Sequence, residues 1–437
     1  MSIELRNLKG TKDFLPTEQK VREKITKTLT EYFQLYSFEP LETPILEYYD
    51  ILASKYAGGA EILKETYKLI DQGNRELGLR YDLTVPTCRV IGMNPHMKLP
   101  FKRYEIGKVF RDGPVKAGRA REFTQCDVDI IGVKSQLAEA ELIALTFDVF
   151  SSLKINITLQ VNNRKLLSGM LLFSGFKKEE LGDVILSIDK LEKIGSKGVK
   201  DELNEKGYTG KNVDKLFDLL LMNSKSLDIL NELEKIIDNS TAKEGIKELQ
   251  QLFKVLPYLD VPLEKVKFTP SLARGLEIYT GTVFEAFMEN GPVNSSLAAG
   301  GRYDKIIGNF LESHKEYPAV GISFGLVPIY DTLVGLKIVD QTVNDRVLVI
   351  SIKQDPLALK ITTQLRKAGI KTEFNFKKKI GKAMEYANTE NFPWTIIIGN
   401  QEASEEKYTL KNMVSGQEEK CSLEQLVEKL KAKNETN

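Results

Sequence analysis

Two strand-like segments joined by a turn-rich loop constrain the fold of this 437-residue chain most strongly. The segments are PFKRYEIGKVF at 100–110 and REFTQCDVDIIGV at 121–133, and both are rich in β-branched and aromatic residues. The loop between them, DGPVKAG, has the glycines and proline typical of turns, so the two strands are expected to pair antiparallel. Further strand patterns occur at 77–85, 278–288 and 317–325. We therefore predict an antiparallel sheet.

Helical segments flank and interrupt these strands. Apolar residues at helical spacing predict helices at 17–36 and 136–153. The stretch from 164 to 259 is charged and amphipathic, with almost no strand pattern, which predicts a helical insertion. The expected fold class is therefore α+β, an antiparallel sheet flanked by helices and interrupted by a helical insertion.

A separate α/β module is expected at the C-terminal end. A strand pattern at 347–350 precedes a helix that has Pro356 in its first turn and Gly369 just beyond its end. A buried-strand pattern follows at 394–398. The predicted domain organisation has four parts: residues 1–163, 164–259, 260–336 and 344–437.

The composition restricts the chemistry. Lys and Arg number 62 and Asp and Glu 61, so the net charge is +1 and a nucleic acid would have to be bound by local basic patches. Only two histidines, His96 and His314, occur, which favours neither a metal site nor a histidine-based catalytic triad. The chemistry is expected to depend on arginines and carboxylates.

The cysteines and the hydropathy pattern indicate the environment. The three cysteines, Cys88, Cys126 and Cys421, are odd in number and widely spaced, as expected of reduced thiols. No apolar run reaches the roughly 18 residues of a membrane span. A cytoplasmic protein without a membrane-spanning segment is therefore predicted.

Two segments combine arginines, carboxylates and polar side chains. In Arg80–Thr84, Asp82 and Thr84 would share one face of a strand, which suits an ammonium group, although an exposed salt bridge is the more frequent explanation of such a pattern. In 111–129, three arginines precede a strand face with Gln125, Asp127 and Asp129. Such a face can bind a polyphosphate at one end and a cationic amino acid at the other; a solvated charged face is an equally good explanation.

Two further segments place arginines beside glycines. SLARGLEIYTG, at 271–281, projects Arg274 from a tight backbone. AAGGRYD, at 298–304, has a glycine pair that allows the backbone to approach a ligand closely, although most glycine pairs are simple turns.

In their order and spacing these segments resemble the histidyl-tRNA synthetase family, over essentially the whole chain. Gly10–Pro16 is similar to its N-terminal signature, Thr43-Pro44 to motif 1 at the dimer interface, and 111–129 to motif 2. SLARGLEIYTGTVFE and AAGGRYD resemble the two blocks specific to this family, and Ala319–Leu326 resembles motif 3. The final module resembles the anticodon-binding domain.

The resemblance implies a class II synthetase fold and a homodimer. The implied reaction is the ATP-dependent attachment of L-histidine to tRNA(His) through a histidyl-adenylate, with Mg²⁺ accompanying ATP and no metal-binding residues in the chain. The implied catalytic residues are Arg111 and Arg274. The implied ATP-binding residues are Arg111, Arg119, Arg121 and Arg274. The implied histidine-binding residues are Asp82, Leu83, Thr84, Arg111, Gln125, Asp129, Arg274, Ile278, Tyr279 and Tyr303.

Two positions depart from the family pattern. Ile278-Tyr279 stands where the family has two adjacent aromatic residues, and Pro328 stands where motif 3 has an arginine. The alternative to an enzyme is a non-catalytic paralogue, either a histidine sensor or a regulatory subunit in histidine biosynthesis. Such relatives typically lack the anticodon module and the arginine of the Arg-Gly-Leu block, and this chain has both.

Overall fold

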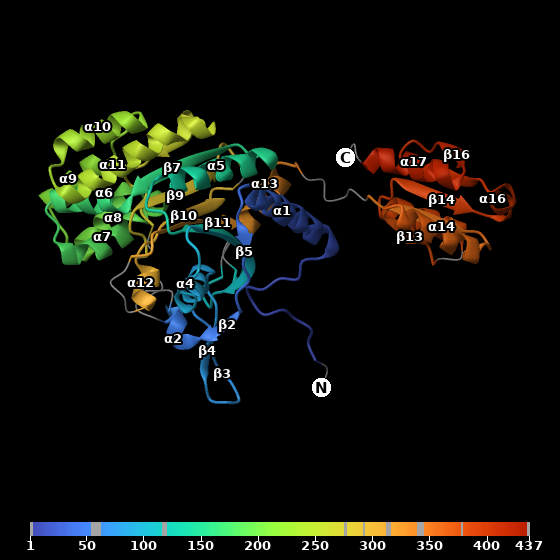
Figure 1. The fold of residues 1–437 in the computed structure, drawn as a ribbon, viewed down its shortest axis with the longest axis horizontal. Coiled ribbons are helices and arrows are strands. Elements are labelled where there is room, and N and C mark those ends of the chain that lie inside the picture. Colours follow the sequence, from blue (N-terminus) through green and yellow to red (C-terminus); the bar gives the residue numbers. More distant parts are fainter. Residues whose placement is uncertain are drawn as a thin grey trace. The chain divides into compact units, whose positions relative to one another are not determined.

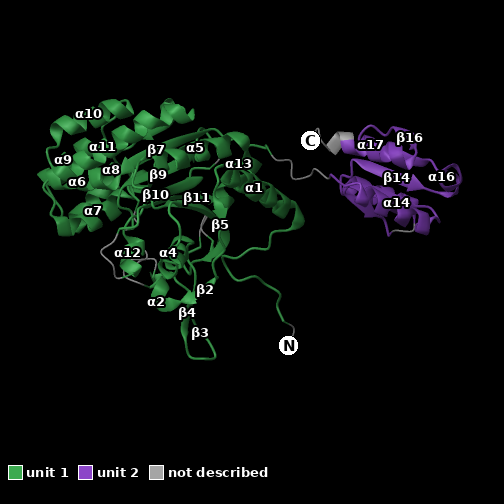
Figure 2. Cartoon of the chain, viewed as in Figure 1, with its two compact units in different colours: residues 1–339 green, residues 340–437 purple. Residues whose placement is uncertain are grey.

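The computed structural model divides the chain into two compact units, Met1–Val339 and Asp340–Asn437 (Figure 2). We refer to them as unit 1 and unit 2. The structure describes residues 3–53, 63–115, 120–274, 278–291, 293–311, 316–338, 345–376 and 379–434.

Unit 1 is built on a sheet of eight strands among the described residues. In spatial order these are β1 (Glu39–Pro40), β5 (Phe101–Phe110), β6 (Glu122–Ile131), β11 (Ala319–Gly325), β10 (Ala298–Arg302), β9 (Thr282–Met288), β7 (Ile157–Asn163) and β8 (Val266–Phe268). Only the outer pairs, β1 with β5 and β7 with β8, are parallel. The predicted antiparallel sheet is confirmed, and β5 and β6 form its longest hairpin.

One face of this sheet is covered by helices. They are α1 (Pro16–Leu35), α5 (Leu137–Ser152) and α13 (Leu326–Gly335), of which α1 and α5 lie close to the predicted helical ranges. Alternation along β6 places Cys126, Val128 and Ile130 in the hydrophobic core on the helical side, together with Phe33 of α1 and Phe150 of α5. The intervening side chains of β6 therefore face the opposite side of the sheet.

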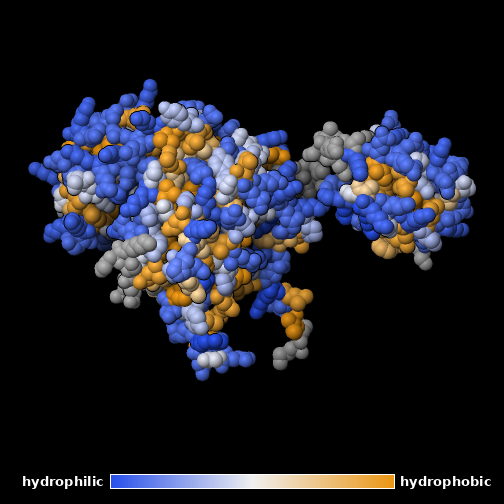
Figure 3. Space-filling view, viewed as in Figure 1, coloured by the Kyte–Doolittle hydropathy of each residue, from blue (hydrophilic) through white to orange (hydrophobic). Residues whose placement is uncertain are grey.

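The predicted helical insertion is confirmed as a run of helices between β7 and β8. It comprises α6 (Arg164–Phe173), α7 (Leu181–Ile188), α8 (Leu191–Glu205), α9 (Lys211–Leu220), α10 (Ser226–Ile236) and α11 (Ser240–Val255). Figure 1 shows these helices gathered at one end of the sheet, beside β7 and β9, and the outward surface of α9 and α10 is largely hydrophilic in Figure 3. Their apolar residues belong to the same hydrophobic cluster as the sheet, so the insertion is part of unit 1.

A small sheet lies beside the large one. Its strands are β2 (Leu46–Tyr48), β4 (Glu76–Leu79) and β3 (Lys68–Ile70), and the short helix α2 (Tyr49–Leu52) packs on it. The prediction that a strand continues through Asp82 and Thr84 was wrong, because β4 ends at Leu79 and α4 (Thr84–Met93) begins at Thr84. The Asp82 carboxylate accepts a hydrogen bond from the Val85 amide at 3.0 Å. Satisfying a free amide at a helix N-terminus in this way favours a helix start over a strand.

Unit 2 has the predicted α/β organisation. Its five-stranded sheet has the order β13 (Thr372–Phe374), β12 (Val347–Ser351), β14 (Trp394–Ile398), β15 (Tyr408–Asn412) and β16 (Glu418–Cys421) among the described residues. Its helices are α14 (Asp355–Lys367), α15 (Ile380–Thr389), α16 (Asn400–Glu405) and α17 (Leu423–Asn434). The helix start with Pro356 in its first turn and the left-handed Gly369 after its end are confirmed.

A search of the described residues for helices that are long and apolar enough to cross a membrane finds none.

Candidate active site

Most of the predicted site residues line one cavity of about 920 Å³ in unit 1. From the predicted set, the lining comprises Asp82, Thr84, Arg111, Gln125, Asp129, Arg274, Ile278, Tyr279 and Tyr303. The cavity lies on the side of the sheet that faces away from α1 and α5. Its volume is typical of a small-molecule binding site.

Strand β6 forms the floor of the cavity. Gln125, Asp127 and Asp129 all line it, as the period of two along a strand requires. Two of these groups are held by neighbouring segments: the Gln125 amide donates to Ser323 Oγ on β11 at 3.2 Å, and the hydroxyl of Tyr303, directly after β10, donates to Asp129 Oδ1 at 2.5 Å. The floor is thus a row of acceptors of fixed orientation.

A fully buried arginine supports this floor. Arg103 on β5 is 0% exposed and is the cross-strand partner of Asp129, with Nη2 at 2.5 Å from Asp129 Oδ2. A buried carboxylate without a countercharge would be strongly destabilising. Arg103 therefore allows a negatively charged floor to exist in the interior.

Burial shifts the carboxyl groups of the cavity toward the protonated form. Removal from water raises the pKa of Asp82 to about 6, against the opposing effects of the Val85 amide and the Arg111 and Arg103 charges. Burial likewise raises the pKa of Asp127 to about 7, with Arg103 opposing the shift and Asp129 adding to it. A bound cation would favour the ionised carboxylates, so the site is suited to a positively charged ligand.

Two arginines enter the cavity from other elements. Arg111 directly follows β5; its Nε donates to the Tyr81 carbonyl at 3.1 Å, and its guanidinium lies 5.0 Å from the Phe123 ring centre. Arg274 precedes β9 and is paired with Glu285 at 2.5 Å. Both guanidinium groups have fixed orientations, which suits them for phosphate oxygens.

The glycines of the AAGGRYD segment permit close packing of backbone around the cavity. A Cβ at Gly300 would lie 2.0 Å from the Gly321 carbonyl oxygen of the adjacent strand, and one at Gly321 would lie 1.9 Å from Asp129 Oδ1. The absence of side chains here therefore makes room both for the strand pairing and for the Asp129 carboxylate. Gly300, Gly301 and Gly321 all line the cavity.

Two of the predicted residues that the structure describes, Leu83 and Arg121, do not line the cavity. Leu83 is fully buried and is absent from the lining; its carbonyl accepts from the Thr87 hydroxyl at 2.8 Å. Arg121 lies beside the N-terminal segment, where its amide donates to the Gly10 carbonyl and its side chain pairs with Asp112 at 3.2 Å. Arg119 lies outside the described residues.

The structure adds residues that the sequence did not single out as site residues. Glu285 lines the cavity, and so do Asp189, Lys190 and Lys193 from the α7–α8 region of the insertion; Asp127, which the sequence placed on the candidate face without a role, lines it too. The alternation along β6 was a signal for Asp127. No local pattern identifies the insertion residues, because only the packing of α7 and α8 beside the sheet brings them there.

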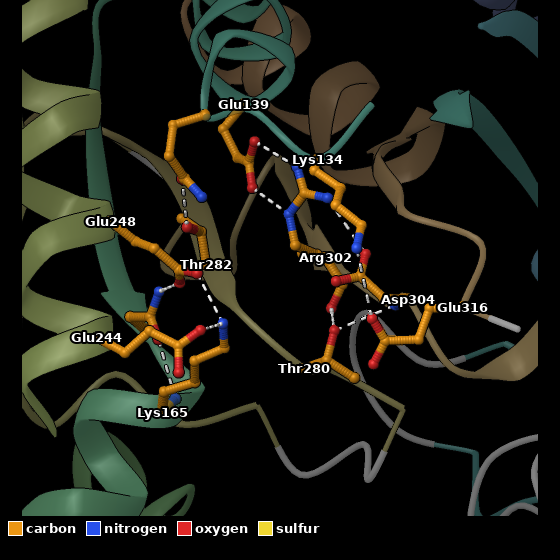
Figure 4. A network of polar contacts seen from close by, with 12 residues as sticks. Lys134, Glu139, Lys165, Glu244, Glu248, Thr280, Thr282, Arg302, Asp304 and Glu316 are labelled. Carbon is orange, nitrogen blue, oxygen red and sulfur yellow. Dashed lines mark hydrogen bonds and ion pairs between the residues drawn. The ribbon is translucent and has the colours of Figure 1, made fainter. Parts of the chain in front are cut away.

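Arg302 of the AAGGRYD segment does not line the cavity but forms a buried ion pair. It is 3% exposed and forms two hydrogen bonds with Glu139 of α5, at 2.6 and 2.7 Å, and one with Asp304 at 3.1 Å. Figure 4 shows this network, in which Asp304 also bonds Thr280. Arg302 therefore ties the strand β10 to the helical layer.

Comparisons with known proteins agree over the full length. The histidyl-tRNA synthetase family matches residues 10–329, and the anticodon binding domain matches residues 346–433. Histidine--tRNA ligase 1 of Bacillus thuringiensis subsp. konkukian is 47% identical over 97% of this chain and 99% of its own length.

Solved structures show the same fold. The crystal structure of histidyl-tRNA synthetase from Nostoc sp. PCC 7120 is 29% identical and superimposes with a TM-score of 0.86, covering 99% of this chain and 100% of that one. An ATP phosphoribosyltransferase regulatory subunit/histidyl-tRNA synthetase from Bacillus halodurans, at 20% identity, a TM-score of 0.75 and coverage of 92% and 100%, shares the fold alone. With a family match over most of unit 1 and relatives of nearly equal length, the chain belongs to the histidyl-tRNA synthetase family.

Proposed function

We propose that the protein attaches L-histidine to tRNA(His) in two steps, each a substitution. In the first, the histidine carboxylate attacks the α-phosphorus of ATP and pyrophosphate leaves. In the second, a terminal ribose hydroxyl of the tRNA attacks the carbonyl carbon of the resulting adenylate, and AMP leaves. Neither step needs a covalent bond to the protein, so catalysis consists of positioning the substrates and stabilising charge on the phosphoryl group.

One observation supports this proposal above the others. A single cavity combines buried carboxylates, from Asp82, Asp127 and Asp129, with the guanidinium groups of Arg111 and Arg274. Carboxylates suit the cationic amino acid, and guanidinium groups suit the phosphates of ATP. We assign the histidine- and ATP-binding roles to the residues named above on this basis, with Arg111 and Arg274 acting on the phosphoryl group.

Exchange of labelled pyrophosphate into ATP tests the first step directly. The purified protein should catalyse exchange only when histidine is present. Histidine binding without any exchange at millimolar ATP would favour the alternative, a histidine sensor or regulatory subunit.

Mg²⁺ is proposed to accompany ATP. The described residues contain no group of three or more potential ligand side chains arranged around a metal position, and magnesium in nucleotide sites is commonly held by substrate phosphates with one or two carboxylates. Glu285 lines the cavity and pairs with Arg274 through Oε1 at 2.5 Å, and it is the carboxylate proposed to help hold the ion. The ion would neutralise phosphate charge.

A homodimer and a cytoplasmic location complete the proposal. The small sheet of unit 1 exposes large apolar side chains, namely Leu46, Tyr48, Leu69 and Ile70, and such a patch is typical of an interaction surface.

The buried, free cysteines fit a reducing compartment. We keep the division into residues 1–163, 164–259, 260–336 and 344–437 as the proposed functional domains.

Removal of unit 2 should separate the two steps. A shortened protein that ends at Asp340 should keep pyrophosphate exchange, because each unit has its own hydrophobic clusters. It should lose aminoacylation roughly tenfold at subsaturating tRNA, the effect of about 1.4 kcal/mol of lost binding. The exposed Phe376 ring, 87% exposed, is the candidate stacking surface for anticodon bases, and the following Lys377 and Lys378 lie outside the described residues.

The matched control for the shortened protein is the full chain with Phe376→Leu, which keeps unit 2 but removes the ring. It should show a smaller loss of aminoacylation and unchanged exchange. Equal aminoacylation by the shortened and full-length proteins would contradict the role of unit 2.

Pro328 should limit the affinity for ATP. It lies in the first turn of α13, where proline is tolerated, in the place of a family arginine. Pro328→Arg should lower the Michaelis constant for ATP by about two- to thirtyfold, since a cation–π contact contributes roughly 0.5–2 kcal/mol. Exchange kinetics at varied ATP measure this, and Pro328→Gln, which adds length without charge, should leave the constant unchanged. A Michaelis constant that is the same for the arginine and glutamine variants would remove position 328 from ATP binding.

A further inference from the structure

The segment that carries Arg274 into the cavity is neither a helix nor a strand. It comprises residues 269–274, directly after β8, and residues 271–274 line the cavity. One turn bond lies within the segment, from the Leu272 amide to the Thr269 carbonyl at 2.9 Å. Buried backbone carbonyl groups need hydrogen-bond donors, so the conformation of this segment depends on donors from other elements.

A buried asparagine on β7 supplies two of these donors. Asn162 is 0% exposed, and its side-chain nitrogen donates to the Pro270 carbonyl at 2.9 Å and to the Leu272 carbonyl at 2.8 Å. Its Oδ1 accepts from the Asn163 amide at 2.8 Å, which fixes the orientation of the side-chain amide. An asparagine side chain has two N–H donors, and Asn162 uses both of them on the backbone that leads directly to Arg274.

The guanidinium of Arg274 is held by the strand next to β7. Glu285 of β9 accepts from Arg274 Nη1 at 2.5 Å. Asn162 pairs with Val283, which lies two residues before Glu285 on the same strand. Paired residues and residues two apart on a strand project from the same face, so Asn162 and Glu285 share one face of the sheet. The backbone before Arg274 and its side chain are thus both fixed by the strand pair β7–β9.

We propose that Asn162 is a positioning residue for Arg274, because its amide holds the backbone from which the guanidinium reaches the phosphoryl group. This inference rests on the proposed function. Asn162 does not line the cavity, so it acts through Arg274. Electrostatic stabilisation requires the charge to be in place before the reaction, and a misplacement of about 1 Å can lower a rate by about a hundredfold.

The test is a double-mutant cycle between positions 162 and 274, measured by histidine-dependent pyrophosphate exchange in the full-length protein. Asn162→Ala should lower kcat roughly ten- to a hundredfold, because the guanidinium is misplaced. In the Arg274→Ala background the same substitution should lower kcat by less than about threefold, since no guanidinium remains to be positioned. A loss of folded protein would instead lower exchange by the same factor in both backgrounds.

Asn163→Ala is the matched control. Asn163 is also 0% exposed, but its side chain accepts from the Lys165 amide at 2.9 Å and donates to Glu248 at 2.7 Å, both in the insertion. This variant should change kcat by less than about twofold in either background. Hydrogen exchange at the amides of residues 271–274 should become faster in Asn162→Ala and stay unchanged in Asn163→Ala, because only Asn162 is bonded to this segment.

Melting temperatures report whether each variant is folded. Asn162→Ser, which has a shorter side chain with one donor, repeats the cycle if the alanine variant is unfolded. Unfolding of both variants would show that Asn162 is required for folding and would overturn the inference.

Two other outcomes contradict the positioning role. They are equal losses in the two backgrounds and a folded Asn162→Ala variant with normal exchange. A natural protein that shows no exchange contradicts the proposed function, and with it the role of Asn162 in catalysis. An active natural protein with equal losses contradicts only the positioning role, so the two failures are distinguishable.

Discussion

Replacement of Arg274 by alanine should reduce histidine-dependent pyrophosphate exchange by about 10²–10³, equivalent to roughly 3–4 kcal/mol of lost transition-state stabilisation. Arg274 lines the cavity, and its guanidinium is oriented by the ion pair with Glu285 at 2.5 Å. A charge held in place before the reaction stabilises the phosphoryl group without any cost of reorganisation. The loss should therefore appear mainly in kcat, with a smaller rise in the Michaelis constant for histidine from the proposed contact of Arg274 with the amino acid.

Arg346→Ala is the matched control for Arg274→Ala. Arg346 forms a similar pair with Glu373 at 2.6 Å, but it lies in unit 2, so its removal should leave exchange unchanged. Circular dichroism and a melting curve establish whether the Arg274 variant is folded. If the folded Arg274 variant shows normal exchange, Arg274 has no catalytic role. If the variant is unfolded and the natural protein shows no exchange, Arg274 is a structural residue.

Replacement of Arg302 by methionine should destabilise unit 1 by roughly 3–5 kcal/mol, the usual consequence of removing one partner of a buried ion pair. Arg302 and Glu139 are 3% and 0% exposed. Without the guanidinium, the Glu139 carboxylate would be left buried without its countercharge; burial already raises its pKa, and Arg302 opposes that shift. Urea unfolding of the shortened protein that ends at Asp340 measures the change in a single unit.

Two further variants serve as comparisons for the loss of stability in Arg302→Met. Lys134→Met removes an ion pair of the same region, Lys134–Glu316 at 4.0 Å with side chains 78% and 55% exposed (Figure 4), and should cost less than about 1 kcal/mol. Arg302→Met combined with Glu139→Gln should recover part of the stability, since no buried charge then remains. A loss for Arg302→Met as small as that for Lys134→Met would mean that the Glu139 pair contributes little.

Pro356 and Gly369 in unit 2 are examples of structure that the local sequence predicts well. Pro356 and Gly369 marked the start and end of one helix, and α14 follows that prediction. The reason is that both residues act through their own backbone dihedral angles, independently of distant contacts. The alternation of side chains along β6 was also predictable from local geometry. The sequence therefore predicted that Gln125 and Asp129 point to the same side of the strand, and both line the cavity.

Asp82 and Thr84 show where local pattern fails. Strand-like alternation through LGLRYDLTV was interrupted because the Asp82 carboxylate satisfies the Val85 amide and begins α4. The side chains of Asp82 and Thr84 nevertheless both line the cavity. Their predicted proximity was therefore right, although the predicted strand was wrong.

The sequence by itself determined the order of elements, the helical insertion, the separate C-terminal α/β module and, through resemblance, the family. Each of these depends on periodicity or on residue order, which are local properties. Tertiary structure alone decided that Arg103 supports Asp129, that Arg302 pairs with Glu139, and that the α7–α8 region contributes Lys190 and Lys193 to the cavity. These contacts join residues far apart in the chain. A charged residue becomes buried next to its countercharge only in the folded protein, so the pairing cannot be read from local sequence.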